Sequence, residues 1–325
     1  MTAEANGHGE AMESFDLNLL LRPNGLLLVR DARRVGAERL VSAAHRDGDL
    51  VRLRKGIYVP EPIWSSLSPD DRYRVRIDAA AVALRKDALF SHYSAARLWG
   101  LPIAGPWPPE VHTLTSGDRG GRSAPGIIRH TTQGSVARRM RYGLAVTDPA
   151  RTVVDLARIA RLEDAVAVAD AALRLKLTDE TALRSLARDL PGRRGGRQVR
   201  FAIEFADPLA ANGGESKMRV VIAQLGFALP VLQQAFSDAD GPVGVVDAVW
   251  PDERIILELD GRQKYVREEF TQGRDVADIV LAEKHREDRL RALGYTVVRA
   301  TWEDLVHPSR LAAKLERAGL QRAFR

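Results

Sequence analysis

The sequence predicts a multi-domain α/β protein, and three observations support this prediction. The chain has 325 residues, which is long for one compact domain. Its first part has the pattern of two short helices followed by a β-hairpin, typical of a winged helix-turn-helix. Its last part alternates helices and strands in the order α-β-β-β-α-β-α, which would bury one sheet beneath helices. We therefore expect a winged helix-turn-helix, an α+β middle domain and a C-terminal α/β domain.

The composition narrows the class of protein. Hydrophobic residues make up 45% of the chain and charged residues 28%, as in ordinary globular proteins. The net charge of +6 and the recurring arginine clusters suit an anionic partner such as nucleic acid, or equally a solvated arginine-rich surface. The absence of cysteine excludes disulfides and thiolate zinc sites and is compatible with a reducing cytoplasm. No apolar run approaches the ~20 residues of a membrane span, so we expect a cytoplasmic protein with no membrane partner.

The first domain is predicted at residues 15–62, after a disordered leader at 1–14 that lacks a signal-peptide pattern. Its second helix, at about 37–46, would be the recognition helix, and its hairpin would be the wing. Basic side chains on both elements suit contacts with DNA phosphates and grooves. The alternative is a small helical protein-interaction module. The predicted DNA-binding residues here are Arg39, Arg46, Arg52, Arg54 and Lys55.

The middle domain is predicted at residues 63–190 and mixes helices with short strands. Ser68 precedes a helix with proline at its first position, and Ser91 is predicted to cap a helix that ends at Gly100. The segment 191–200, PGRRGGRQVR, is rich in glycine and arginine and is predicted to be a linker. The domain also holds scattered histidines without metal-ligand spacing, so we expect no chemical role for them: His92, His112 and His130.

A family resemblance covers roughly residues 15–190. The segment GDLVRLRKGIYVP at 48–60 and the segments SHYSAA at 91–96 and LWGLP at 98–102 resemble AbiE-type antitoxins, the autorepressing components of a type IV toxin–antitoxin system. The resemblance implies transcription regulation through operator binding, with a toxin protein as a possible partner, and it implies no catalysis. Helix-turn-helix proteins often dimerise on two-fold sites, so a homodimer is a further possibility.

The C-terminal domain, predicted at 201–325, contains a β-hairpin at 243–264 that carries several acids. Two apolar runs, VGVV and RIILEL, flank a turn at residues 251–254. Counting outward from the turn pairs Trp250 with Ile255 and Asp247 with Glu258. Asp260 lies two residues further and shares the face of Glu258. Like charges opposite each other destabilise a sheet, and hard divalent cations are the usual partners of clustered carboxylates.

The same domain resembles the very-short-patch-repair-like branch of the PD-(D/E)XK endonuclease superfamily. The matching blocks are GESKMR at 214–219, the Asp247 strand, ILELDG at 256–261, and the later Asp288-Arg289 and Val298-Arg299 pairs. The resemblance implies that Asp247 and Glu258 bind Mg²⁺ or Mn²⁺. It also implies roles at the catalytic site for Glu215, Asp260 and Lys264 and DNA contacts for Arg289 and Arg299. The motif's usual lysine, two residues after the second acid, is replaced here by Asp260, and Lys264 on the same rim could serve instead.

Two functions remain open. The first is a DNA-binding protein whose C-terminal domain hydrolyses DNA phosphodiester bonds with a divalent metal, in repair or defence. The second is a non-catalytic transcriptional regulator or antitoxin that uses a degenerate nuclease fold for binding. The acids at 247, 258 and 260 favour the first, and the antitoxin-like first half with the altered lysine position favours the second.

Overall fold

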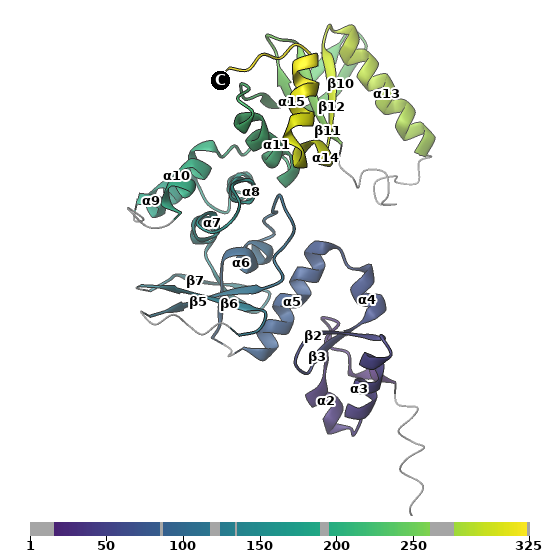
Figure 1. Ribbon diagram of the computed structural model, residues 1–325, viewed down its shortest axis with the longest axis vertical. Coiled ribbons are helices and arrows are strands. Elements are labelled where there is room, and N and C mark those ends of the chain that lie inside the picture. Colours follow the sequence, from purple (N-terminus) through teal and green to yellow (C-terminus); the bar gives the residue numbers. More distant parts are fainter. Residues whose placement is uncertain are drawn as a thin grey trace, which may run out of the picture. The chain divides into compact units, whose positions relative to one another are not determined.

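The protein is described by a computed structural model that covers residues 16–84, 87–117, 124–133, 135–188, 195–260 and 276–323, the side chains of 276–280 excepted. Its contacts divide it into two compact units (Figure 1). Unit 1 consists of the described residues up to Gly100 and of those within Pro106–Asp148. Unit 2 consists of Leu101–Gly105 and the described residues from Pro149 onward. The units combine helices with three sheets, which confirms a mixed α/β chain of more than one domain. Within the described ranges, no helix is long and apolar enough to cross a membrane.

Unit 1 begins with a three-stranded sheet and the helices packed against it. The strands follow the order β1-β3-β2, and β2 and β3 form an antiparallel hairpin that turns at Gly56, whose φ is 73°. Leu27, Val41 and Tyr58 pack in one core between helix and sheet. The elements are η1 (Leu17–Leu20), β1 (Leu27–Leu28), α2 (Val29–Arg34), α3 (Glu38–Arg46), β2 (Leu50–Arg54), β3 (Ile57–Pro60) and α4 (Glu61–Ser66). The predicted succession of two helices and a hairpin is therefore present.

The rest of unit 1 is a five-stranded sheet in the order β6-β5-β4-β8-β7, with helices α5 and α6. Ser68 accepts a hydrogen bond from the Asp71 backbone and so caps α5, and Gly100 ends α6 at a φ of 75°. Both helix boundaries agree with the prediction, but the expected cap at Ser91 is wrong, because its side chain makes no capping hydrogen bond and instead lies 3.0 Å from His92 Nδ1. Two strands, β4 and β7, were not predicted, since LF is short and RRMR has no apolar alternation. The elements are α5 (Pro69–Ala83), β4 (Leu89–Phe90), α6 (His92–Trp99), β5 (Val111–Ser116), β6 (Ile127–Thr132), β7 (Arg138–Arg141) and β8 (Leu144–Thr147).

Unit 2 opens with four helices: α7 (Pro149–Ala157), α8 (Leu162–Arg174), α9 (Glu180–Arg188) and α10 (Gly196–Phe205). Helix α8 is buried almost throughout and packs against α7, α10 and the later helix α11. The predicted linker at 191–200 is helical from Gly196 onward. A buried stripe at helical spacing is formed by Val199, Ala202 and Ile203. The sequence prediction missed this helix because glycine and arginine dominate the residues before the stripe.

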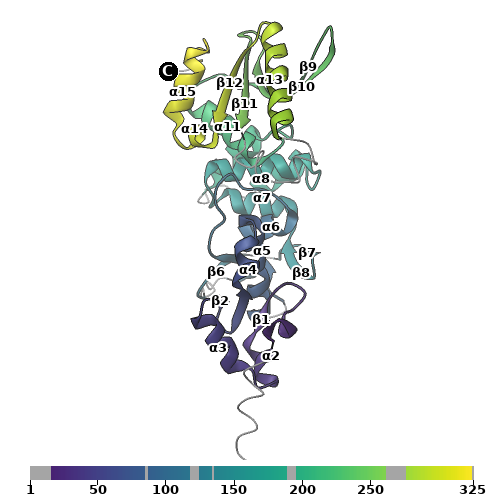
Figure 2. The same ribbon diagram turned by 90° about the vertical axis from the view of Figure 1, so that its right-hand side faces the viewer.

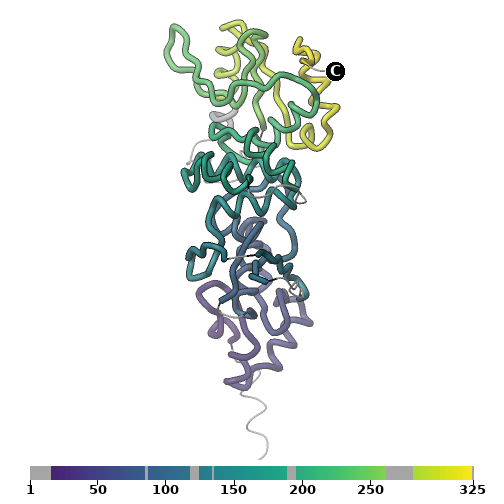
Figure 3. Tube along the Cα trace, turned by 90° about the vertical axis from the view of Figure 1, so that its left-hand side faces the viewer, coloured from purple at the N-terminus to yellow at the C-terminus, as the bar shows by residue number. Residues whose placement is uncertain are grey.

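Unit 2 continues as a four-stranded sheet between two layers of helices. The order is β12-β11-β10-β9, antiparallel except between β11 and β12. Figure 2 shows α13 on one side of this sheet and α14 and α15 on the other, and the β9–β10 hairpin extends beyond it (Figures 2 and 3). The predicted α-β-β-β-α-β-α order is present, with the short α14 added. The elements are α11 (Gly213–Gln224), β9 (Val231–Asp238), β10 (Gly241–Trp250), β11 (Ile255–Asp260), α13 (Val276–Ala292), β12 (Thr296–Thr301), α14 (Trp302–Val306) and α15 (Pro308–Arg317).

Candidate functional site

The β10–β11 hairpin has the register that the sequence predicts. Trp250 pairs with Ile255 and Val249 with Ile256, and the ladder continues to Ala248 and Leu257. One more step in this register brings Asp247 opposite Glu258. At that step the Leu259 backbone N–H donates to Asp247 Oδ2 at 2.9 Å, so this hydrogen bond ties the Asp247 carboxylate to β11.

A third carboxylate, Glu215, enters from the first turn of α11. Asn212 caps this helix by accepting from the Gly214 and Glu215 backbones at 2.9 and 3.0 Å. A Cβ atom on Gly214 would lie 2.9 Å from Leu259 Cδ2, so glycine permits the close approach of α11 to β11. The Glu215 carboxylate is 2% exposed and accepts hydrogen bonds from Ala211 N, Asn212 Nδ2 and Gln233 Nε2 at 2.8, 2.7 and 3.0 Å. These donors hold one buried acid in a defined position.

Electrostatics shows that the three acids are neighbours. Burial raises the pKa of Glu215 to about 7; the hydrogen bond from Ala211 opposes this rise, and the negative charge of Asp247 adds to it. Burial also raises the pKa of Glu258, where Arg286 opposes the rise and Asp247 again adds to it. Asp247 therefore acts on both glutamates, and the three carboxylates form what we call the acid cluster: Glu215, Asp247 and Glu258.

The raised pKa of Glu215 predicts a pH-dependent stability. The folded protein holds this proton up to about pH 7, and the unfolded chain releases it near the ordinary value of 4.5. The free energy of unfolding should therefore fall as the pH rises through this window, by an amount on the order of 3 kcal/mol. In Glu215→Gln, which cannot ionise, we expect a flatter profile in urea denaturation between pH 5 and 8. Glu303→Gln, at an exposed carboxylate, is the control. Parallel profiles for wild type and Glu215→Gln would contradict the assignment.

Arginines from α13 and β12 neutralise part of this acidic region. Arg286 Nη2 donates to Glu258 Oε1 at 2.9 Å, while its Nη1 is buried without a hydrogen-bond partner. Arg299 donates to Asp260 and Glu283 at 2.8 Å each and to Glu287 at 2.9 Å. Asp260 is thus held in an arginine network, and its hydrogen-bond partner is Arg299 rather than a member of the acid cluster. Strand alternation predicts that Asp260 shares the face of Glu258, but it carries no information about this arginine partner.

The predicted DNA-contacting residues have different environments. Arg289 donates to Asp238 at 2.7 Å and to the Gly241 carbonyl at 2.9 Å, so it holds the β9–β10 turn. Arg299 is hydrogen-bonded to the carboxylates just described, so both arginines have partners within the chain, and their contacts with DNA stay a prediction. In unit 1, Arg54 donates to the Pro125 carbonyl at 2.9 Å. The predicted catalytic residue Lys264 lies outside the described residues. The other four predicted basic residues are exposed on α3 and β2–β3: Arg39, Arg46, Arg52 and Lys55.

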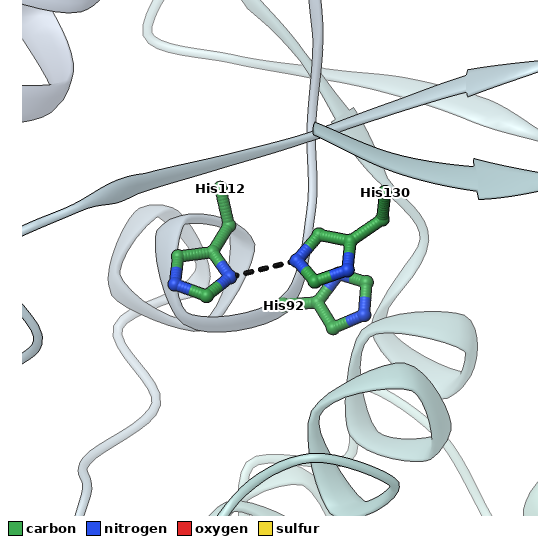
Figure 4. A group of neighbouring side chains, drawn as sticks. All are labelled: His92, His112 and His130. Atoms are coloured by element: carbon green, nitrogen blue, oxygen red, sulfur yellow. Dashed lines mark hydrogen bonds between the residues drawn. The ribbon is translucent and has the colours of Figure 1, made fainter. Parts of the chain in front are cut away.

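A second cluster lies in unit 1, at histidines that have no metal-ligand spacing along the chain. His92 opens α6, His112 lies in β5 and His130 lies in the neighbouring strand β6 (Figure 4). Among the residues that the structure describes, these three are the one group of three or more His, Asp or Glu side chains whose ligand atoms all lie within 4.8 Å of one another. The expectation that they are scattered is wrong, because β5 and β6 pair in parallel and α6 packs on β5. Spacing along the chain gives no signal for this proximity.

These features define an α/β protein of two compact units with a buried acid cluster in one unit and a histidine cluster in the other. No family model matches the chain. It is 32% identical over 273 residues to the uncharacterised proteins MT2308 and Rv2248 of two Mycobacterium tuberculosis strains, covering 84% of this chain and 93% of each relative. The chain therefore belongs to the family of these proteins. A crystal structure of the RV2827C protein from Mycobacterium tuberculosis aligns with a TM-score of 0.38 and 14% sequence identity. The alignment covers 68% of this chain and 87% of that one, and a likeness this distant shows neither a shared fold nor a shared function.

Proposed function

We propose that the protein binds DNA and hydrolyses its phosphodiester bonds with a divalent metal at the acid cluster. One observation carries the proposal: the paired residues of the hairpin end at Ala248 and Leu257, one step before Asp247 and Glu258, and the charge of Asp247 acts on both Glu258 and the buried Glu215. Such a concentration of like charge is unfavourable in a sheet unless a cation offsets it. The order of elements and the acids at these positions resemble the very-short-patch-repair-like endonucleases.

The donor set fits Mg²⁺ or Mn²⁺. Asp247 and Glu258 supply carboxylate oxygens from adjacent strands, and Mg²⁺ is commonly held by one or two carboxylates plus water. When bound, the ion would lower the pKa of a coordinated water and stabilise the leaving oxygen. The Leu259 N–H holds Asp247 in place, and Glu215, with a pKa of about 7, suits a proton acceptor near neutral pH. Arg286 must share Glu258 with the cation, since it donates to that carboxylate at 2.9 Å.

The DNA-binding part of the proposal concerns the start of unit 1. We propose that α2, α3 and the β2–β3 hairpin are a winged helix-turn-helix, as in the AbiE-type antitoxins that this segment resembles. Exposed basic residues on both α3 and the hairpin support the proposal, because a recognition helix and a wing contact phosphates with such side chains.

The direct test of the nuclease is a cleavage assay. Full-length protein is incubated with single-stranded, double-stranded and mismatched DNA in Mg²⁺, in Mn²⁺ or in chelator. We expect DNA cleavage that requires the metal and is absent from Asp247→Ala. Equal cleavage by the two proteins, or none from the wild type in any metal, would refute the proposal.

A non-catalytic regulator or antitoxin is the second candidate, and a specific observation favours it. Glu258 and Asp260 have arginine partners, and Asp260 stands where the superfamily's motif has lysine. An arginine that neutralises a carboxylate supplies the positive charge that a bound metal ion would otherwise supply. Under this alternative the protein binds its DNA site, as a homodimer or with a toxin protein, and cleaves nothing.

Both candidates require the wing, which yields a further prediction. We expect Arg52→Ala combined with Lys55→Ala to weaken DNA binding and to flatten the dependence of log Kd on log salt concentration by up to about 2, since each phosphate contact contributes about 0.9 to the slope. Fluorescence anisotropy across a salt series measures both quantities. The control is Arg310→Ala, because Arg310 is exposed on α15 in unit 2. An unchanged slope in the wing variant would exclude phosphate contacts by these residues.

A further inference from the structure

The three histidines in unit 1 form a compact, largely buried group. The ring centroids of His92 and His130 are 3.6 Å apart, and those of His112 and His130 are 5.1 Å apart. His112 Nδ1 lies 2.9 Å from His130 Nε2, the contact drawn in Figure 4. His92 and His112 are 5% and 3% exposed, and His130 is half-buried. Imidazole nitrogens from three separate elements therefore meet in a site that excludes most water.

The cluster has the features of a ligand site rather than of ordinary core packing. His112 Nδ1 faces His130, and His112 Nε2, on the side of the ring away from the other two histidines in Figure 4, is buried without a hydrogen-bond partner. His92 adopts a φ of 49°, a left-handed conformation that is uncommon for residues other than glycine. His92 Nδ1 lies 3.0 Å from Ser91 Oγ, which fixes the orientation of this ring in the way that outer hydrogen bonds orient metal ligands.

The protonation state of the cluster also suits a cation. Burial, together with the neighbouring His130, lowers the pKa of His112 to about 3, so that His112 is neutral at physiological pH. Neutral imidazole is the form that binds metal. One of the two nitrogens in the His112–His130 contact carries a proton. When a metal cation binds the nitrogen that carries this proton, the proton moves to the other nitrogen of the same imidazole ring.

We propose that His92, His112 and His130 bind one borderline transition-metal cation, with Zn²⁺ as its representative. Three imidazole nitrogens and an open fourth position match the coordination that Zn²⁺ adopts in His₃ sites. Zn–N bonds of about 2.0–2.1 Å require the stacked rings to turn so that their lone pairs converge. The cation would join α6 to β5 and β6. Its nitrogen donors select a different metal class from the carboxylate oxygens of the acid cluster.

The test uses full-length protein that has been stripped of metal and then titrated with Zn²⁺ or Co²⁺. We expect one Zn²⁺ bound per chain by calorimetry, a rise in the thermal midpoint of unfolding, and visible Co²⁺ absorption bands of four-coordinate geometry. Asp247→Asn, which alters only the acid cluster, should retain all three signals. This variant separates failure of the histidine site from failure of the nuclease proposal.

Two histidine variants provide the comparison. His130→Gln is expected to bind Zn²⁺ at least about 100-fold more weakly and to lose the Co²⁺ bands, because even outer-sphere changes cost 10- to 100-fold in affinity. Because His130 is half-buried, glutamine can be accommodated there, and circular dichroism verifies the fold. His307→Gln, at an exposed histidine, should bind like the wild type. The proposal is overturned if a folded His130→Gln retains wild-type affinity, or if the wild type binds no Zn²⁺.

Discussion

Asp247→Asn should lower metal-dependent DNA cleavage by at least about 100-fold while leaving DNA binding and thermal stability close to those of the wild type. The carboxylate faces Glu258 across the hairpin and raises the pKa of both neighbouring glutamates. Under the proposed mechanism, removal of one charged ligand would lower the charge stabilisation at the metal by several kcal/mol. Each 1.36 kcal/mol of activation free energy changes the rate tenfold. Asparagine retains a side-chain oxygen that can accept the Leu259 N–H, so the hairpin should remain intact.

The matched control is Asp252→Asn. Asp252 is an exposed aspartate in the turn of the same hairpin, and its replacement removes one negative charge without altering the acid cluster. Cleavage rates are measured at saturating DNA over a range of Mg²⁺ and Mn²⁺ concentrations, and binding is measured with Ca²⁺. If both variants cleave at the wild-type rate, Asp247 is not a metal ligand. If Asp247→Asn also loses DNA binding, the acid cluster acts in binding rather than in catalysis.

Asp170→Ala should destabilise unit 2 by about 3–5 kcal/mol, the largest effect on stability that we expect from a single substitution. Asp170 in α8 is fully buried, and its Oδ2 lies 3.2 Å from Nη1 of the buried Arg219 in α11. Its Oδ1 accepts the Asp207 N–H at 2.8 Å. Arg219 also donates to the Phe205 carbonyl at 2.7 Å. Alanine at 170 would leave the buried guanidinium with only the Asp207 carboxylate, 4.0 Å away, as counter-charge, and it would leave a backbone N–H without its acceptor.

The experiment is urea denaturation combined with hydrogen exchange of peptides from α8 and α11. The control is Arg184→Ala, which breaks an exposed ion pair with Glu180 and should cost less than about 1 kcal/mol. The double variant Asp170→Ala, Arg219→Met should be less destabilised than Asp170→Ala, because no unpaired charge remains buried. Equal losses in Asp170→Ala and Arg184→Ala would show that the buried pair contributes no more than a surface pair.

Much of the local structure could be predicted from the sequence because it depends on short-range periodicity. The hairpin register followed from counting outward from Pro251–Arg254, and Trp250 does pair with Ile255. Ser68 and Gly100 marked helix boundaries because a cap and a left-handed glycine act through neighbouring backbone groups. The segment at 196–205 was missed because arginine and glycine dominate its first half.

The sequence by itself determined the two helices and hairpin at the start of the chain, the α-β-β-β-α-β-α order at its end and the β10–β11 register. Only the tertiary structure decided that Arg286 and Arg299 partner Glu258 and Asp260, that Arg289 holds a turn, and that three distant histidines meet. The physical reason is the range of the interactions. Periodicity and capping act within a few residues of chain, whereas these contacts depend on how whole strands and helices pack against one another.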